Sequence, residues 1–340
     1  MIVWRVLIVF FSVLALFIAA LIGMLAIAFL GPSESARDRL ALSLLETSAA
    51  DFIPAVFLSS ELLSEIADSN TVFETTEVTD TSLISAPDSE SAEAEDEWAD
   101  HPNGIRIEMT YGGTYRGYVM LIRDPSRVYA ATSSDFKSGK PGLRIPEALK
   151  REGAVAAING GGFPDDGTFG VPGDVPIGLV FSKGRLLWGD ENKVYSSVMG
   201  FDNNNIFIVG NMSPKEAKKI GIRDAMCFGP ILIVNGEPAQ ITGSGGSLNP
   251  RTAIGQRADG TVIFLCVDGR MPSSLGASYT DLIEIMMEYG AVNAANLDGG
   301  TSTTMMYKGE TVNIPSSLYG PRRIPTFFMV RAIEGQDDEG

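Results

Sequence analysis

The chain has 340 residues, room for one large domain or two ordinary ones, and a formal net charge of −16. Nearly all of that charge lies between Arg39 and Arg106, an interval with 15 acidic residues and no Lys or Arg. Since the rest of the chain is close to neutral, it offers no basic surface for nucleic acid, and we expect no nucleic-acid partner.

Residues 6–30 form the first predicted element, an apolar helix without a charged side chain. Its length exceeds the ~20 residues that span a bilayer and the roughly 7–15 apolar residues of a signal peptide. Ala26-Ile27-Ala28 resembles a cleavage site, so removal of the segment stays open as an alternative. The short leading segment, residues 1–5 with Arg5, favours a cytoplasmic N-terminus. We therefore predict a single-pass anchor in the cell membrane, with the remainder of the chain outside the cytoplasm.

Two segments separate this anchor from the main domain. Residues 31–67 show apolar residues at helical spacing, interrupted at Pro54, and are predicted to form a juxtamembrane amphipathic helical segment. Residues 68–102 are rich in Ser, Thr, Asp and Glu and have too little apolar surface to offset the entropy lost on ordering. We expect a flexible acidic stalk there, and an acidic tail at residues 334–340.

The main domain is predicted over residues 103–333, where short apolar runs are separated by Gly, Asn and Asp. Eight runs are predicted as strands: residues 118–122, 127–132, 154–158, 177–181, 206–209, 231–234, 262–267 and 291–296. Three helices are signalled: one opened by Pro146 and closed by Gly153, one from Ser213 to Gly221, and one over residues 278–289. Strands outnumber helices without regular alternation, which predicts an α+β fold of strand-rich mixed sheets with a few flanking helices.

Two cysteines and one histidine limit the chemistry. Cys227 and Cys266 lie in apolar runs; they either pair outside the cytoplasm or stay as buried free thiols, and the sequence leaves both open. The one histidine, His101, lies at the end of the acidic segment. A Ser-His-Asp triad, a Cys-His dyad and an HExxH zinc site all require a histidine in the core. Catalysis therefore falls to carboxylates, Arg, Lys, hydroxyls, backbone amides or an oxygen-ligated cation.

Glycine-rich turns follow two predicted strands, in AVAAINGGGF (154–163) and AVNAANLDGG (291–300). Gly160, Gly161 and Gly162 permit close backbone approach and supply consecutive amides, which suits an anionic ligand. Neither turn has GxGxxG or GK[ST], so neither is a dinucleotide fingerprint or a P-loop. The plain alternative is that both are ordinary turns at the edge of a sheet.

Asp268 in FLCVDGR and Asp298 in NLDGG each end an apolar strand and precede a glycine. The helix between them, residues 278–289, is a short crossover that can return both strand ends to one edge, as in a βαβ unit. Glycoside hydrolysis uses two such carboxylates, one at the cationic transition state and one for proton transfer. Each acid alone is equally well explained as a turn cap.

The motifs INGGGF, GPILIVNGEP, RTAIGQRADG, VDGR with the later GAS, and above all NAANLDGGTSTTM resemble those of the phosphodiester glycosidase family. That family includes the uncovering enzyme, which removes N-acetylglucosamine from mannose-6-phosphate signals, and bacterial members associated with exopolysaccharides. The resemblance covers roughly residues 105–332, in the family's motif order, and excludes the predicted anchor and stalk. It implies an α+β domain that hydrolyses a sugar-1-phosphodiester, such as a phosphoglycan, freeing the sugar and leaving a phosphomonoester.

The resemblance also implies which residues gather at the active site. The matching positions are Asn159, Gly160, Gly161, Gly162, Arg251, Asp268, Asn296, Asp298, Gly299, Gly300, Thr301, Ser302 and Thr303. We expect Asp298 to stabilise or attack the anomeric carbon and Asp268 to position water or the sugar hydroxyls. Arg251, together with Arg270, is expected to hold the phosphate through parallel hydrogen bonds. A phosphate leaving group is a weak base, so this chemistry does not require a histidine.

Two other functions use the same turns: a non-catalytic envelope module that binds anionic glycans, and a transferase that passes the sugar to an acceptor alcohol. No cofactor is expected. Asp165, Asp166 and Asp174 could ligate calcium, although a solvated acidic loop is the simpler interpretation. The sequence makes no prediction of metal dependence or oligomeric state.

Overall fold

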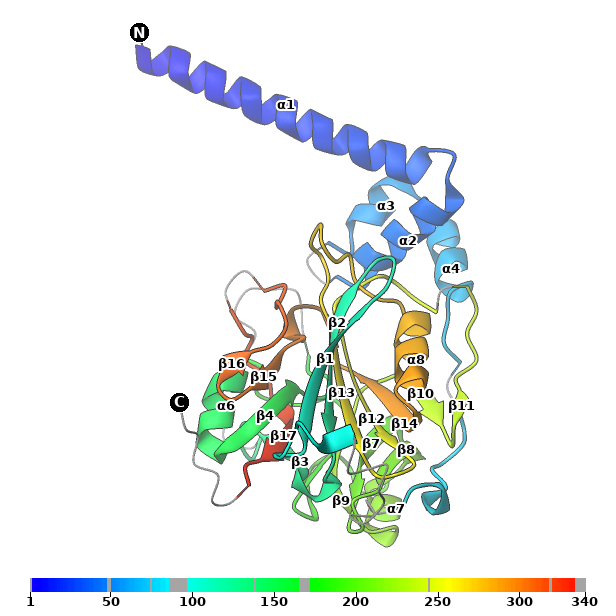
Figure 1. The fold of residues 1–340 in the computed structure, drawn as a ribbon. Coiled ribbons are helices and arrows are strands. Elements are labelled where there is room, and N and C mark those ends of the chain that lie inside the picture. The colour runs from blue at the N-terminus through cyan, green and yellow to red at the C-terminus, as the bar shows by residue number, and fades with distance from the viewer. Residues whose placement is uncertain are drawn as a thin grey trace.

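The computed structural model describes residues 2–47, 50–73, 75–85, 97–136, 139–164, 172–243, 245–317 and 320–333. Within these residues a long helix, α1 (Ile2–Leu30), leads into a small helical bundle, and three antiparallel sheets follow (Figure 1). Strands predominate and few helices flank them, so the predicted α+β class is confirmed.

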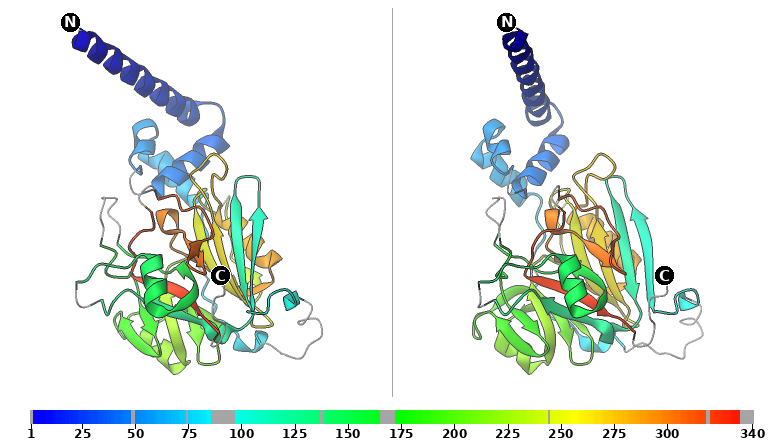
Figure 2. Two further views of the ribbon diagram at one scale, coloured as in Figure 1. Left: turned by 60° about the vertical axis from the view of Figure 1, so that its left-hand side comes forward. Right: turned by 90° about the vertical axis from the view of Figure 1, so that its left-hand side faces the viewer.

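The apolar helix α1 projects away from the sheets (Figure 2). Its most apolar part has a mean hydropathy of 3.0, and none of that part is buried inside the protein. The length and composition of α1 suit a membrane span or a signal anchor. The side of the membrane on which each end lies stays a prediction.

Three short helices form a bundle at the C-terminal end of α1: α2 (Glu34–Leu45), α3 (Ile53–Phe57) and α4 (Ser60–Asp68). They form where helical spacing predicted them, and Pro54 lies in the first turn of α3, where a missing N–H is not needed. Ala41 and Leu42 of α2 are buried in one apolar cluster with Phe29 of α1, whose ring stacks on Phe57 at 5.2 Å. The bundle therefore joins α1 to the rest of the chain through packed side chains.

The acidic segment predicted as a flexible stalk does not stand free in its described parts. Val72 pairs with Ile241, and the Phe73 N–H donates to the Gln240 carbonyl. Trp98, only 5% exposed, is buried in the core that lies beneath the first sheet. The prediction rested on the average composition of the segment and overlooked these few apolar residues, which hold the segment against the sheets. Residues 86–96 and the predicted tail, 334–340, lie outside the described residues.

The first sheet has seven strands in the order β1, β2, β13, β12, β14, β10, β11. Their bounds are β1 (Ile105–Tyr111), β2 (Arg116–Ile122), β13 (Val262–Val267), β12 (Arg251–Arg257), β14 (Ala291–Leu297), β10 (Ile231–Val234) and β11 (Glu237–Pro238). Helix α8 (Tyr279–Glu288) covers one face and buries Leu282, Ile285 and Met286 against it.

The second and third sheets have five strands each, in the orders β16-β15-β4-β17-β3 and β6-β5-β9-β7-β8. The second sheet contains β16 (Glu310–Thr311), β15 (Met305–Tyr307), β4 (Ala154–Asn159), β17 (Thr326–Arg331) and β3 (Val128–Thr132). The third contains β6 (Arg185–Trp188), β5 (Val180–Ser182), β9 (Ile222–Cys227), β7 (Tyr195–Asp202) and β8 (Phe207–Met212). The remaining helices are α6 (Ile145–Glu152) and α7 (Pro214–Lys219), both with proline in the first turn as predicted.

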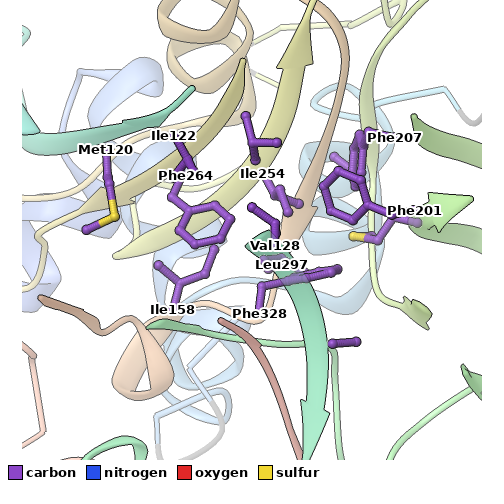
Figure 3. Packing of buried hydrophobic residues seen from close by; sticks show 14 of the residues in the cluster. Met120, Ile122, Val128, Ile158, Phe201, Phe207, Ile254, Phe264, Leu297 and Phe328 are labelled. Carbon is purple, nitrogen blue, oxygen red and sulfur yellow. The ribbon is translucent and has the colours of Figure 1, made fainter. Parts of the chain in front are cut away.

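One apolar core joins the three sheets (Figure 3). Phe264 and Leu297 of the first sheet meet Phe328 of the second and Phe201 of the third in this cluster. Because each sheet contributes one apolar face, the three sheets fold as a single packed unit. Each of the eight predicted strands has an observed counterpart; β5 starts later than predicted, at Val180.

The two cysteines are free and buried, which decides between the two alternatives left open by the sequence. Burial raises the pKa of Cys227 to about 11 and also raises the pKa of Cys266. A thiolate nucleophile is therefore disfavoured at either position.

Candidate active site

The site is built at one edge of the first sheet, where three strands end or begin. Strand β12 begins at Arg251, and β13 and β14 end one residue before Asp268 and Asp298. Because β12 pairs antiparallel with both β13 and β14, those two strands run parallel to each other on either side of it. Helix α8 makes the connection between them. The predicted crossover is thus present, with β12 inserted between its two strands, and it brings both acids to the edge that carries Arg251.

Asp298 is half-buried, and contacts with β4 fix its backbone. Its N–H donates a hydrogen bond to the Gly160 carbonyl at 3.1 Å, and its carbonyl accepts a hydrogen bond from Asn159 Nδ2 at 2.6 Å. The fully buried Asn159 also accepts the Thr252 hydroxyl at 2.8 Å through Oδ1. Asn159, predicted to bind substrate, instead ties the end of β4 to the end of β14 and positions Asp298.

The glycine turn does not offer its amides to a ligand, which corrects the sequence interpretation. The Gly160 N–H donates to the Thr326 carbonyl, that of Gly161 to the Thr326 hydroxyl, and that of Gly162 to the Cys227 carbonyl. A Cβ on Gly160 would lie 2.6 Å from the Thr326 backbone, and one on Gly161 would lie 2.4 Å from the Cys227 carbonyl oxygen. Gly160 and Gly161 are present because neighbouring backbone passes too close for any side chain, while a Cβ on Gly162 would meet the ring of Phe228.

Gly160→Ala is expected to destabilise the protein by about 2–3 kcal/mol, because the backbone of Thr326 cannot yield to the added methyl group. Denaturant unfolding of the two proteins measures the difference. Gly113→Ala is the matched control, since a Cβ there meets nothing within 4 Å, and it should cause no loss. Equal stability of the Gly160 and Gly113 variants would contradict this packing role.

Asp268 is completely buried, and both of its carboxylate oxygens are occupied. Oδ2 lies 2.9 Å from Arg116 Nη2, while Oδ1 accepts the Ile314 N–H at 2.8 Å and the Asn313 Nδ2 at 3.3 Å. Asn313 Nδ2 also donates to the Thr303 carbonyl at 3.2 Å. A carboxylate so committed is poorly suited to proton transfer, and the structure favours a positioning role for Asp268, through Asn313, on the stretch after Asp298.

Arg251 is the centre of a polar group that we call the Arg251 cluster: Ser247, Asn249, Arg251, Arg270 and Tyr279. The Arg251 side chain is 5% exposed and lies 4.1 Å from the centroid of the Tyr279 ring. It donates to the Tyr279 hydroxyl at 2.9 Å, and to the backbone carbonyls of Ala277 at 3.3 Å and Ser247 at 3.0 Å. These contacts within the protein hold the guanidinium in one orientation.

Arg270, also predicted to bind phosphate, lies beside Arg251 in the same cluster. Its Nε and Nη2 donate to Asn249 Oδ1 at 3.2 and 3.0 Å. A Cβ on Gly300 would lie 3.4 Å from its guanidinium, which places Arg270 against the glycine pair after Asp298. Desolvation and the neighbouring charge of Arg251 lower the pKa of Arg270, and two adjacent cations of this kind favour an anion between them.

The pKa of the Tyr279 phenol is affected by several charged groups of the site. Burial raises the pKa of Tyr279; Arg251 opposes that change, while the negative charges of Glu46 and Asp298 add to it. Gly299 and Gly300, which follow Asp298, lie against the backbone of Pro250 and Arg251 and the guanidinium of Arg270, so Asp298 and the Arg251 cluster belong to one site. Glu46, from the end of helix α2, is a member that the sequence did not reveal, because no motif connects it to Arg251. Asn249 and Tyr279 were also missed, although Asn249 stands only two residues before Arg251.

The hydroxyl-rich stretch after Asp298 forms a short 3-10 helix, η3 (Gly300–Ser302). Three buried side-chain atoms in this region have no hydrogen-bond partner among the described residues: Asn296 Oδ1, Ser302 Oγ and Thr303 Oγ1. Buried polar atoms are nearly always paired, so a ligand hydroxyl or a water suits these positions. Thr301 instead accepts Arg322 Nη1 at 3.3 Å. Gly299 and Gly300 let this stretch approach β12, where the Gly300 N–H donates to the Pro250 carbonyl at 2.8 Å.

In the described part of the chain, no group of three or more His, Cys, Asp or Glu side chains could hold a metal ion. Asp165 and Asp166, two of the three residues named for calcium, lie outside the described residues. Among the described residues, His101 forms backbone hydrogen bonds with Trp98 and Gly104, and none is found between His101 and Asp298 or the Arg251 cluster.

A family model described as phosphodiester glycosidase matches residues 152–331. The SPbeta prophage-derived uncharacterized protein YomE of Bacillus subtilis (strain 168) is 32% identical over 174 residues, 48% of this chain and 26% of that protein. The N-acetylglucosamine-1-phosphodiester alpha-N-acetylglucosaminidase of Bos taurus is 25% identical over 241 residues, 63% of this chain and 44% of that protein. The chain thus matches less than half the length of these curated relatives.

Among solved structures, the catalytic domain of the zebrafish N-acetylglucosamine-1-phosphodiester alpha-N-acetylglucosaminidase, auto-inhibited by its pro-peptide, superposes with a TM-score of 0.59. The match covers 76% of this chain and 88% of that chain at 18% sequence identity. At this identity the likeness shows a shared fold.

Proposed function

Because the chain belongs to the phosphodiester glycosidase family, we propose that it is a hydrolase that cleaves the glycosyl–phosphate bond of a sugar-1-phosphodiester. The proposed substrate is a GlcNAc-1-phosphodiester or a similar unit of a phosphoglycan, in cell-envelope or exopolysaccharide metabolism. The name of the bovine relative supports the choice of sugar. The observation that carries the proposal is the half-buried Asp298 at the sheet edge where β12 begins with Arg251, followed by Gly300, which lies against the Arg270 guanidinium.

The chemistry divides between these three side chains. The oxygen of water forms a bond to the anomeric carbon as the bond from that carbon to the phosphate oxygen breaks, and one proton of the water passes to solvent. The anomeric carbon gains positive charge on the way, and we assign Asp298 to stabilise that charge. In the two-step alternative, the Asp298 carboxylate bonds to the carbon as the phosphate leaves, and water then breaks that bond to free the sugar. The departing phosphate gains negative charge, which Arg251 and Arg270 are placed to stabilise. A leaving group that is already a weak base needs little help from a general acid.

The remaining predicted residues take two kinds of role in this proposal. Asn296, Ser302 and Thr303 have the unpaired buried oxygens reported above and are assigned to the sugar hydroxyls. Asn159 and Asp268, whose side chains bond to the protein, are assigned to position Asp298 and the stretch after it. This division replaces the two-carboxylate site expected from the sequence with one reacting carboxylate.

We further propose that α1 anchors the chain in the cell membrane, with its N-terminus in the cytoplasm and the sheets outside. The apolar length of α1 supports an anchor. Labelling with an impermeant thiol reagent of cysteines introduced at exposed positions in intact cells tests which side carries the sheets.

Product analysis tests the proposed activity. The full-length chain in detergent, incubated with a GlcNAc-1-phosphodiester, is expected to release reducing sugar and phosphomonoester in equal amounts, with and without chelator. Sugar transferred to an added acceptor alcohol would identify a transferase instead. Binding of anionic glycan without any product over long incubation would identify a binding module and contradict the proposal.

A further inference from the structure

The end of helix α2 enters the Arg251 cluster. Glu46 is the C-cap residue of α2, and its Oε2 lies 2.9 Å from Arg251 Nη2 and 3.1 Å from Asn249 Nδ2. Its Oε1 accepts the Ser247 N–H at 3.4 Å. The next residue, Thr47, accepts Arg270 Nη2 at 2.9 Å through its hydroxyl. Both guanidinium groups assigned to the substrate phosphate thus contact a segment from far upstream in the chain.

The groups around Glu46 are those of an anion-binding site. Its partners in the cluster include three N–H donors: a guanidinium, a side-chain amide and a backbone amide. Guanidinium groups bind carboxylate and phosphate with the same paired geometry. Burial raises the pKa of Glu46, but attraction to Arg251 and hydrogen bonds from Ser247 and Asn249 outweigh it, so its pKa lies below the ordinary value. The bound carboxylate is accordingly charged.

The cation of this pair is fixed, and the anion is the more replaceable partner. Arg251 is 5% exposed and is held by Tyr279, Ala277 and Ser247, whereas the Glu46 side chain is 36% exposed. Removing Glu46 would therefore leave an oriented, desolvated guanidinium with a free donor edge. A buried charge without its partner is strongly unfavourable, so another anion would be drawn to that position.

We propose that the Arg251 cluster is an oxyanion-binding site which the Glu46 carboxylate occupies in this structure, and that a phosphate-bearing ligand binds there only by displacing Glu46. This proposal depends on the proposed function in one respect: it assumes that the ligand carries a phosphate. Helix α2 connects Glu46 to the helical bundle and to α1, since Ala41 and Leu42 of α2 pack in one cluster with Phe29 of α1. Figures 1 and 2 show α2 between α1 and the end of the sheets. Displacement of Glu46 thus either turns its side chain away or shifts α2 against α1.

Phosphate titration of the full-length chain in detergent tests this inference without turnover. Isothermal titration with inorganic phosphate is expected to give a Kd at least about tenfold lower for Glu46→Ala than for the unaltered chain, because an attached competitor has been removed. Glu46→Gln keeps the shape and loses the charge, and is expected to lower the Kd about threefold. Glu34→Gln, the same change in the first turn of α2, is the matched control and should leave the Kd unchanged.

Thermal unfolding of each variant shows whether it is folded. If Glu46→Ala is unfolded, Glu46→Gln still decides the test. A phosphate Kd that is unchanged or raised in the folded Glu46 variants would overturn the inference. Failure of the proposed function is a separate result: tighter phosphate binding without hydrolysis of any sugar-1-phosphodiester supports the anion site and rejects the activity. If hydrolysis occurs, Glu46→Ala should lower KM and retain kcat. A fall in kcat with unchanged phosphate binding would place Glu46 among the reacting groups and overturn the inference.

Discussion

Replacing Asp298 with Asn is expected to lower kcat for a sugar-1-phosphodiester by about a thousandfold, since the neutral amide cannot offset the charge that develops at the anomeric carbon. The bonds that tie Asp298 to β4 come from its backbone N–H and carbonyl, which the substitution does not change. The fold should therefore be retained, with a circular dichroism spectrum and melting temperature close to those of the unaltered chain.

Release of reducing sugar measures this loss, and Asp100→Asn is the matched control because Asp100 lies exposed and far along the chain from the site. The control should keep full activity. Turnover in Asp298→Asn at the level of the control would reject Asp298 as the reacting carboxylate. An unfolded Asp298 variant would instead show that its side chain is needed for the fold.

Asp268→Ala is expected to lower the free energy of unfolding by about 3 kcal/mol, because it leaves Arg116 without its buried partner and the Asn313 and Ile314 donors unpaired. Asp268 is 0% exposed and Arg116 is 23% exposed, so only part of the lost pairing can be recovered from water. Urea unfolding monitored by tryptophan fluorescence measures the change.

Activity should also fall in Asp268→Ala, through disorder of the stretch that Asn313 holds. Glu191→Gln serves for comparison, since it breaks the exposed pair with Lys218 and should leave stability unchanged. If Asp268→Ala were as stable as the Glu191 variant yet inactive, Asp268 would be a reacting group and the positioning role given to it here would be wrong.

Local sequence signals were sufficient for the frame of the site. Strands β13 and β14 are apolar runs that end next to Asp, and the capped helix between them predicted the crossover that brings Asp268 and Asp298 to one edge. These features depend on residues close together in the chain, where periodicity and turn chemistry act directly. The family's motifs then predicted which strand ends carry the site residues. Strand β12, which lies between β13 and β14 in the sheet, was not among the predicted strands.

The partners of each side chain were less predictable, because they come from distant segments. The bond from Arg116 to Asp268 joins residues 152 positions apart, and that from Arg251 to Glu46 joins residues 205 apart. Neither pairing leaves a mark in local periodicity. The glycine turn shows the same limit: INGGGF correctly indicated close backbone approach, but the neighbour is β17 at Thr326 and not a ligand. Strand β1, in which apolar and polar residues alternate, was missed for lack of a continuous apolar run.

The contacts of residues 71–73 and 75–85 with the sheets, together with the bundle of α2, α3 and α4, limit which ligands the site can reach. With α1 in a membrane, the bundle would hold the sheets near that surface, and they would not swing on a long tether. The ligands within reach are those that diffuse laterally in, or project from, the same leaflet. Occupancy of the site is then governed by the surface density of the ligand, and its bulk concentration matters only after the sheets are released from α1.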